Sequence, residues 1–486
     1  MSLYDQLTAY GQSDAYPMHM PGHKRNTEKF SMKDPYGWDI TEIDGFDDLH
    51  EPEGILAEGM RRAAELYGAA ESWYLINGST AGILAGISAC TRPGDRVLMA
   101  RNCHKSVYHA VALNQLTPVY LHPAVDPVSG ILASIDPIDV ELALASHEIS
   151  LVVLTSPTYE GILSDIQMIA AICHRRGVPL LVDEAHGAHL SSGKLYTSCF
   201  PEGAVSCGAD LVVQSLHKTL PALTQTGLIH RQGSLVSGAR VKHALDIYQT
   251  SSPSYILMAG IDRCVRWMET DGSRLLGSWA ERLRYFYRRM DGLHSLSVVT
   301  LDTCERFFAW DPSKLVISTR GTGHTGRELM EILRREYRLE LEMASGDYVI
   351  AMTGAGDTEE GIQRFADAVL AIDAAWSRQD AADGKPIDVW GQFCEKVYCT
   401  PSQAEPWAGE YIPLAAEALG KISLEFVYAY PPGIPVLVPG EEVTECVLHV
   451  IEAYEKAGIP MRGYERQTSH ELRVMEPAER LMGSAR

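Results

Sequence analysis

Short apolar runs alternate with helical patterns between about residue 70 and residue 230. The runs are rich in Val, Leu and Ile and have the length of buried strands; they lie at 96–100, 119–122, 151–155, 180–183, 211–215 and 228–230. Between them, Ile166, Ile169 and Cys173 recur at the spacing of one helix face, and Val107 and Val111 do the same. This alternation predicts an α/β domain with a mostly parallel sheet and crossover helices.

The segments on either side have different patterns. The first 50 residues are polar, weakly periodic and rich in Pro, Gly and His, which indicates an arm before the sheet. The pattern is helical from Ser252 to about residue 291. Residues 305–370 then predict a smaller α+β unit, with strands at 314–318 and 348–352 and a helix at 327–337. A polar stretch at 377–385 is typical of a linker. We therefore expect an arm, a large domain, a small α+β domain and a C-terminal domain, at 1–50, 51–300, 301–376 and 386–486.

Charge and cysteine usage narrow the classes of function. The chain of 486 residues has 42 Lys and Arg against 63 Asp and Glu, and its net charge of −21 predicts no nucleic-acid partner. Ten dispersed cysteines without a C-x-x-C pair indicate reduced thiols. The chain does not begin with a basic region followed by an apolar run, and it has no uninterrupted apolar stretch of about 18 residues. We expect a cytoplasmic protein without a membrane partner.

A carboxylate and a lysine follow two of the predicted strands. Asp183 ends one strand and begins the segment Asp183-Glu-Ala-His-Gly-Ala-His189, and Lys218 comes just after the strand at 211–215. Because open α/β sheets bind ligands at the carboxyl ends of their strands, both side chains are expected at one edge. Enzymes that use pyridoxal 5'-phosphate (PLP) need this pair: a lysine binds the cofactor covalently, and a carboxylate keeps the pyridine nitrogen protonated. Taken alone, Lys218 is better explained as a solvated surface lysine and Asp183 as an ordinary helix N-cap, so only their combination indicates PLP.

Further polar groups are predicted at the same edge. Asn77-Gly78-Ser79-Thr80 opens a helix, where free N–H groups and two hydroxyls suit a phosphate, although an ordinary N-cap has the same residue types. His104 follows the strand at 96–100, where its ring would stack on a pyridine ring or cap a helix. Ser156-Pro-Thr-Tyr-Glu-Gly161 follows the strand at 151–155. The ends of several strands thus have candidate ligands.

Jointly these motifs resemble one family, the ornithine/lysine/arginine decarboxylases of aminotransferase-like fold (fold type I). The matching segments in the sheet region are Gly78-Ser-Thr80, Arg101-Asn-Cys-His-Lys-Ser106, Pro157-Thr-Tyr-Glu-Gly161, Asp183-Glu-Ala-His-Gly-Ala-His189 and Ser215-Leu-His-Lys-Thr219. Outside it they are Met20-Pro-Gly-His-Lys24, Asp47-Asp-Leu-His50, Tyr430-Pro-Pro-Gly-Ile-Pro435 and Pro439-Gly-Glu441. The resemblance spans essentially the whole chain. It implies a PLP-dependent transferase-like large domain and the short form of the family, without an N-terminal wing domain.

The resemblance also implies a role for each matched residue. Lys218 would carry PLP as a Schiff base, and Asp183 would pair with the pyridine nitrogen. Ala185 and His104 would pack against the two faces of the ring, with His186 near the phenolic oxygen. The phosphate would be held by Ser79, Thr80, Ser215 and His217. The implied reaction is decarboxylation of a basic amino acid to an amine and carbon dioxide, in which either His104 or Lys218 reprotonates the α-carbon.

The resemblance implies a class of substrate and an oligomeric assembly, but it does not identify the substrate or the number of subunits. Lysine or arginine is favoured over ornithine, with a role in polyamine biosynthesis. The carboxylate that would pair with the distal cation stays open among several candidates, each of which could instead be a solvated surface residue, namely Asp47, Asp48, Glu51, Glu405 and Glu425. A homodimer or larger homo-oligomer with shared active sites is implied, in which the arm containing Met20-Pro-Gly-His-Lys24 orders against a neighbouring subunit unless it is a disordered tail.

Other functions remain open at this point. The same lysine and carboxylate serve a PLP aminotransferase or lyase. Glu184, His186 and His189, backed by Asp183, are side chains of the kind that zinc binds, so a metal-dependent hydrolase is a rival, although the spacing is not H-E-x-x-H. Our prediction is that the site holds no metal. A non-catalytic relic of the fold would require the loss of a key residue, and none is missing.

Overall fold

The computed structural model describes residues 2–31, 35–195, 197–376, 395–430, 433–456 and 458–477. The linker predicted at 377–385 lies outside these residues, and so do both ends of the predicted C-terminal domain, at 386–394 and 478–486.

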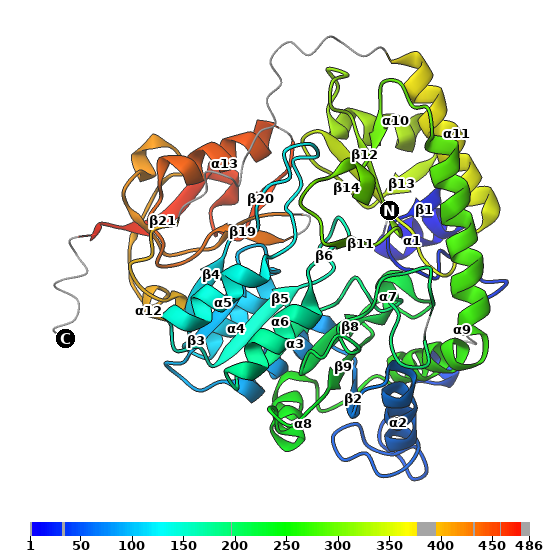
Figure 1. Cartoon of the computed structure of the whole chain (residues 1–486), viewed down its shortest axis with the longest axis horizontal. Coiled ribbons are helices and arrows are strands. Elements are labelled where there is room, and N and C mark those ends of the chain that lie inside the picture. Colours follow the sequence, from blue (N-terminus) through cyan, green and yellow to red (C-terminus); the bar gives the residue numbers. More distant parts are fainter. Residues whose placement is uncertain are drawn as a thin grey trace.

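A seven-stranded sheet forms the centre of the chain (Figure 1). Its order is β2-β9-β8-β7-β5-β3-β4, and each neighbouring pair is parallel except the two that involve β9. The strands are β2 (Glu71–Leu75), β3 (Arg96–Ala100), β4 (Thr117–Leu121), β5 (Leu151–Thr155), β7 (Leu180–Asp183), β8 (Leu211–Ser215) and β9 (Gly227–Arg231). The predicted α/β fold with a mostly parallel sheet is confirmed.

The apolar pattern found the central strands and missed one at the edge. β5, β7 and β8 are buried along nearly their whole length, and such strands are continuous apolar runs in the sequence. β4 begins two residues before the predicted run, and β9 is one residue longer at each end. β2 was not predicted, because it alternates buried and partly exposed positions and follows α2 (Ile55–Tyr67) after a short turn.

Helices pack against this sheet. Those that share a core cluster with its strands are α3 (Gly78–Cys90), α4 (Lys105–Leu113), α5 (Pro137–Ser146), α6 (Ile166–Arg175) and α8 (Gly238–Tyr248). α2 and the long α9 (Tyr255–Met290) belong to a second cluster, which continues into the small domain. α9 occupies the region that the sequence predicts to be helical. The short α7 (Leu216–Thr219) follows β8 directly and contains Lys218.

The small domain is built on an antiparallel sheet of order β10-β12-β15-β14. Its strands are β10 (Ser297–Val298), β12 (Lys314–Ser318), β14 (Met343–Ala344) and β15 (Tyr348–Met352), and its helices are α10 (Gly326–Tyr337) and α11 (Glu359–Ala375). β12 and β15 coincide with the predicted strands, and α10 begins one residue before the predicted helix. β11 (Ala309–Trp310) pairs with β6 (Ile162–Leu163) and so ties this domain to the large one.

The C-terminal domain contains two three-stranded sheets, β16-β21-β17 and β19-β18-β20. Their strands are β16 (Glu410–Pro413), β17 (Ile422–Ser423), β18 (Val427–Ala429), β19 (Ile434–Leu437), β20 (Met461–Arg462) and β21 (Glu471–Met475), and the helices are α12 (Pro401–Ala404) and α13 (Glu445–Lys456). Figure 1 shows this domain beside β3 and β4, across the molecule from α9. Short 3-10 turns complete the chain at Pro35–Gly37, Leu301–Thr303, Ala416–Ala418 and Gln467–Ser469.

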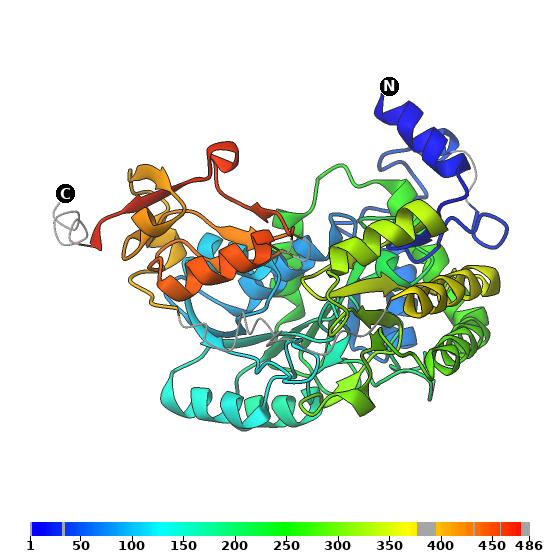
Figure 2. The same cartoon turned by 90° about the horizontal axis from the view of Figure 1, so that it is seen from above.

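Much of the N-terminal arm is ordered against its own chain. β1 (Tyr16–Met18) pairs in parallel with β13 (Leu339–Leu341) of the small domain. Met18 is fully buried and Lys24 is nearly so. α1 (Leu3–Gln12) instead has no buried residue and stands off from the body in Figure 2. Contact of the arm with a second subunit stays a prediction.

Among the helices that the structure describes, none has both the length and the apolar character needed to cross a membrane.

Candidate active site

The carboxyl ends of the parallel strands meet at one edge of the central sheet. Asp183, the last residue of β7, pairs with Val213 of β8. Ser215, the last residue of β8, and Leu75, the last of β2, both pair with Gly227, so these two strand ends lie in one row. α3 and α7 begin immediately beyond this row. The motif residues that follow these strands are therefore neighbours in space.

Lys218 meets the loop that follows Asp183. Its Nζ lies 2.8 Å from Nε2 of His186. Asp183 Oδ1 accepts a hydrogen bond of 3.1 Å from the N–H of Ala185. Asp183, Ala185 and His186 are buried, whereas Lys218 is partly exposed. The fold thus brings together an amine, a carboxylate and an imidazole that the sequence predicts for one site.

Burial changes the acid–base properties of these groups. It lowers the pKa of Lys218 to about 8, even though the charges of Asp183 and Glu342 favour the protonated amine. Burial raises the pKa of Asp183, against the opposing effect of Lys218. It lowers the pKa of His186, and the charge of Lys218 adds to this effect. An amine with a lowered pKa is more readily deprotonated and therefore a better nucleophile.

The ring of His104 is fixed by the start of α4. Its Nδ1 accepts a hydrogen bond of 3.2 Å from the N–H of Ser106 and lies 2.9 Å from the hydroxyl of that residue. Nδ1 is therefore an acceptor, and the ring's proton lies on Nε2. Burial lowers the pKa of His104 to about 3, and the charges of Lys218 and Lys105 add to this effect. His104 is thus a helix cap and a neutral ring, while its stacking on a cofactor stays a prediction.

The residues predicted to hold a phosphate lie near α3 and α7. Ser79 and Thr80 are in the first turn of α3, whose N-cap residue makes no side-chain capping hydrogen bond. Ser215 Oγ is buried, and within the described part of the chain it has no hydrogen-bond partner. His217 Nδ1 lies 3.0 Å from a backbone carbonyl oxygen. A helix start without a side-chain cap and an unpaired buried hydroxyl are suited to an anionic oxygen.

These side chains fit PLP. Lys218 supplies an amine for its aldehyde, Asp183 a carboxylate for its pyridine nitrogen, and the start of α3 with Ser215 supplies donors for its phosphate. Nδ1 of His186 is a second buried polar atom that lacks a partner among the described residues. Buried polar groups are rarely left unpaired in folded proteins, so two such atoms at one sheet edge indicate a place for a polar ligand.

Glu342 is a site residue that the sequence analysis missed. It lies between β13 and β14 in the small domain, where its Oε1 accepts a hydrogen bond from the hydroxyl of Tyr159 and its Oε2 one of 3.0 Å from the N–H of Met20. The ring of Tyr159 packs against His186, with 4.8 Å between ring centroids. No motif marks Glu342, because only the packing of the small domain brings it near Lys218.

The carboxylates considered for the distal cation mostly have other partners. Asp47 accepts hydrogen bonds from four backbone N–H groups around the start of α2. Glu425 is buried and accepts two backbone N–H groups in the C-terminal domain. Glu51 pairs with a lysine of α8, Asp48 accepts a backbone N–H, and Glu405 is exposed. The carboxylates of Asp47 and Glu425 therefore have a structural role, because they bind backbone N–H groups.

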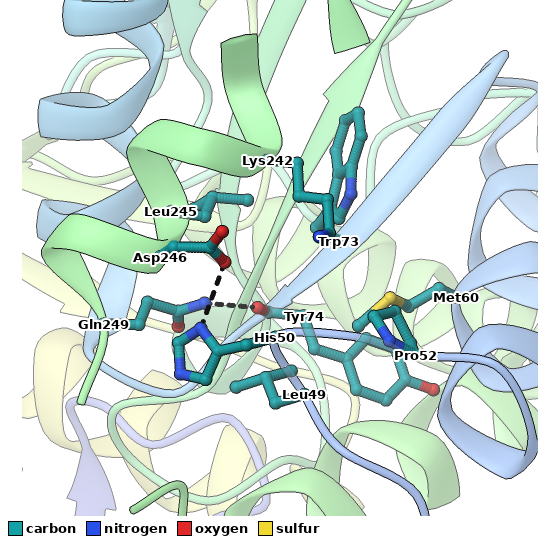
Figure 3. A pocket seen from close by; sticks show the side chains of 10 residues that line it. All are labelled: Leu49, His50, Pro52, Met60, Trp73, Tyr74, Lys242, Leu245, Asp246 and Gln249. Carbon is teal, nitrogen blue, oxygen red and sulfur yellow. Dashed lines mark hydrogen bonds and ion pairs between the residues drawn. The ribbon is translucent and has the colours of Figure 1, made fainter. Parts of the chain in front are cut away.

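Leu49 and His50, the last two residues of the Asp47–His50 motif, line a small hollow beside α8 and β2, which Figure 3 shows. Nδ1 of His50 lies 3.1 Å from Asp246, and its Nε2 lies 2.9 Å from a backbone carbonyl oxygen. Nε2 of Gln249 donates to the carbonyl oxygen of Tyr74 across 3.2 Å. The cavity of about 10 Å³ has room for roughly one water molecule. This motif fastens the end of the arm to the large domain.

The three side chains of the metal-hydrolase alternative do not converge. Glu184 accepts hydrogen bonds from Gln214 and from a backbone N–H. Nε2 of His189 lies 3.1 Å from Asp311, and His186 faces the amine described above. In the described ranges, no group of three or more His, Cys, Asp or Glu residues is arranged to hold a metal ion. This alternative therefore lacks the geometry that it needs.

Known sequences resemble the chain over nearly its full length. Residues 1–319 match the family profile described as Orn/Lys/Arg decarboxylase, major domain, and residues 403–476 match the C-terminal domain of the same family. The chain is 32% identical to an arginine decarboxylase of Halalkalibacterium halodurans, with 98% of each chain covered. It is 31% identical to an arginine decarboxylase of Bacillus subtilis, over 98% of this chain and 97% of the other. It is 24% identical to lysine decarboxylase LdcA of Pseudomonas aeruginosa, over 95% and 76%.

Solved structures share the fold. Lysine decarboxylase LdcF of Francisella novicida is 18% identical, with a TM-score of 0.75 over 90% of this chain and 74% of the other. An alanine–glyoxylate aminotransferase from Nostoc sp. is 13% identical, with a TM-score of 0.52 over 68% and 89%. At these identities the likeness concerns the fold alone, and that fold occurs in decarboxylases and in an aminotransferase.

Proposed function

The chain belongs to the Orn/Lys/Arg decarboxylase family and is a decarboxylase of a basic amino acid; we propose that it uses PLP bound at Lys218 and that its substrate is arginine. The meeting of Lys218, Asp183 and His186 at one sheet edge carries the cofactor proposal. The full-length similarity to two arginine decarboxylases supports arginine. An aminotransferase on the same fold would have the same lysine and carboxylate, but it is not the family that the chain matches.

Each site residue has a task in this reaction. When bound, PLP supplies a ring that accepts the electrons released as carbon dioxide leaves. Lys218 would hold the cofactor covalently through its Nζ. Asp183 would keep the pyridine nitrogen protonated, and its burial would strengthen that interaction. Ala185 and His104 would pack against the two faces of the ring and exclude water.

We assign the proton that reaches the α-carbon to Lys218. His104 has its Nδ1 occupied by the N–H of Ser106, and its pKa of about 3 keeps it from holding a second proton near neutral pH. The amine of Lys218 has a pKa of about 8 and is able to hold and release a proton there.

A substrate panel tests the function. The purified chain is incubated with PLP and with arginine, lysine or ornithine, and carbon dioxide, amine and 2-oxo acid are measured separately. We expect carbon dioxide and the corresponding amine in equal amounts, with the highest kcat/KM for arginine. Formation of 2-oxo acid in place of carbon dioxide would support the aminotransferase. A colourless protein with no band erased by borohydride would contradict PLP.

We propose Glu342 as the carboxylate that pairs with the distal cation of the substrate. Its two oxygens accept hydrogen bonds from Tyr159 and the backbone of Met20, so the group is oriented although no cation of the described residues forms an ion pair with it. Its charge acts on Lys218, which supports a position near the reacting centre. A carboxylate with this fixed orientation suits the planar guanidinium of arginine, which presents two parallel N–H donors.

Replacing Glu342 by Gln is expected to raise KM for arginine by about tenfold or more and to lower kcat much less, because a charge-assisted hydrogen bond to bound substrate is worth about 1.5–3 kcal/mol. Steady-state kinetics measure both constants. Glu340→Gln is the control, since Glu340 lies on β13 and pairs with Arg334 on the surface. Equal KM values for the Glu342 variant and the wild type would rule out this role.

We also propose a cytoplasmic homodimer that supplies amines for polyamine biosynthesis. Leu3, Tyr4 and Leu7 of α1 are 73%, 78% and 60% exposed, and an exposed apolar helix face of this kind supports contact with a second copy of the chain. None of the nine cysteines in the described residues forms a disulfide bond, which supports a reducing compartment.

A further inference from the structure

A fully buried group of charges lies between the small domain and the loop that follows β7. Lys314 and Asp311 are both completely buried, and Lys314 Nζ lies 2.8 Å from Asp311 Oδ2. The other oxygen of Asp311 lies 3.1 Å from Nε2 of His189, and the hydroxyl of Ser313 donates to Asp311 across 2.7 Å. A buried ion pair is often no more stabilising than apolar side chains of the same volume, so net stability alone does not account for it.

Lys314 extends from β12 to the active site. Its Nζ donates a hydrogen bond of 3.2 Å to the backbone carbonyl oxygen of His186. The ring of that same residue lies 2.8 Å from the amine of Lys218. Through Asp311 the group also binds His189, three residues further along the loop. The loop is therefore held to the small domain at two points.

We propose that Lys314, paired with Asp311, is a positioning residue of the active site, which binds the carbonyl oxygen of His186 and so holds the ring of His186 against Lys218. The inference rests on the proposed function, because it gives Lys314 a part in the same PLP site. It also assigns a role to His189, which the decarboxylation mechanism does not use.

Tight packing around Lys314 supports a fixed position. A Cβ atom on Gly161 would lie 2.9 Å from Lys314 Cγ, so the side chain is enclosed by the loop after β5 as well. The N–H of Asp311 donates to the carbonyl oxygen of Gly161 across 2.8 Å. Because close-packed interiors leave little room for movement, a displacement of Lys314 would be passed on to His186.

The charge of Lys314 also affects the two active-site groups that its side chain helps to position. Burial is the main cause of the lowered pKa values of Lys218 and His186, and the positive charge of Lys314 lowers both further. Burial would raise the pKa of Asp311, but His189 and Lys314 outweigh it and hold that pKa well below its usual range. Asp311 therefore remains ionised. Lys314 thus stabilises the neutral forms of the amine and the imidazole that it helps to orient.

The test is a double variant, Lys314→Met with Asp311→Asn, which leaves neither charge unpaired and keeps an oxygen for His189. In the full chain freed of cofactor, competitive acetylation across a pH series followed by peptide mass spectrometry gives the titration midpoint of Lys218. Loss of the positive charge of Lys314 should move this midpoint upward by a fraction of a pH unit, because the negative charge of Asp311 is lost with it and burial remains the main cause of the low value. PLP affinity and kcat should each fall about tenfold, because the His186 ring is no longer held.

Val316→Ala is the matched control. Val316 lies on the same strand β12, is fully buried and packs in a separate apolar cluster. Its truncation should lower the melting temperature through the loss of two buried methyl groups, while the Lys218 midpoint and the PLP affinity stay at their wild-type values. An equal shift in this control would mean that general loosening of the small domain is the cause, and the inference would be wrong.

The remaining outcomes are equally decisive. A folded double variant with the wild-type Lys218 midpoint and PLP affinity overturns the inference. Should the double variant not fold, Lys314→Gln is measured in the same way: a raised midpoint supports the inference and an unchanged one overturns it. A wild-type chain that binds no PLP would instead contradict the proposed function, and the titration of Lys218 without cofactor separates that failure from a failure of the positioning role.

Discussion

Replacing Lys218 by Ala is expected to abolish decarboxylation and to remove the protein–PLP bond that borohydride reduces. Its amine lies against His186 and acts electrostatically on Asp183, so it is the amine placed to attach the cofactor. Lys314 also reaches the His186 backbone, but it is fully buried in its pair with Asp311 and is not free to replace the lost amine. We expect a loss in kcat of at least about 10⁴-fold, as for other covalent catalysts.

The measurement combines a turnover assay with peptide mass spectrometry after borohydride reduction. The variant should fold, because Lys218 is partly exposed, α7 is a single short turn and Ala is a good helix former. Lys194→Ala is the control: its side chain is 64% exposed and pairs with Glu65, so its loss should change neither readout. A reduced PLP adduct retained at full yield in the Lys218 variant would show that another lysine carries the cofactor.

The sequence predicted the part of the site that lies at the carboxyl ends of the strands. Apolar runs located β7 and β8, and the rule that parallel strands end at one edge predicted that Asp183 and Lys218 lie at the same edge. The α3 motif was interpreted either as a phosphate-binding site or as an ordinary N-cap. These two interpretations differ in whether a side chain caps the helix. The structure shows no such cap, which favours the phosphate interpretation of Ser79.

The sequence pattern could not predict the residues that only tertiary packing brings to the site. Glu342 and Lys314 come from the small domain, and only its docking on the large domain brings them near His186 and Lys218. The weak apolar periodicity of the arm also gave no sign of its strand. β1 is ordered by main-chain pairing with β13, which needs no apolar periodicity. In the sequence, an acid such as Asp47, which binds backbone N–H groups, cannot be distinguished from an acid that binds a substrate cation.

Replacing Asp183 by Asn is expected to lower kcat by about 10²- to 10³-fold while leaving the fold intact. The amide oxygen of Asn is still able to accept the N–H of Ala185, so the loop keeps its hydrogen bond. The neutral amide cannot stabilise a protonated pyridine nitrogen, and the ring then accepts electrons less well. PLP binding should weaken less than turnover, because Lys218 and the donors near the phosphate are unchanged.

Asp210→Asn is the control for this substitution. Asp210 is also almost fully buried and accepts hydrogen bonds from the N–H of Leu180 and from His174, but it lies at the opposite end of the sheet, just before β8. Both variants lose one buried carboxylate, so a defect caused by burial alone would appear in both melting curves and in both kcat values. A loss of kcat confined to the Asp183 variant at saturating PLP would assign the effect to the pyridine nitrogen. Near wild-type kcat in that variant would mean that Asp183 does not hold the ring's proton.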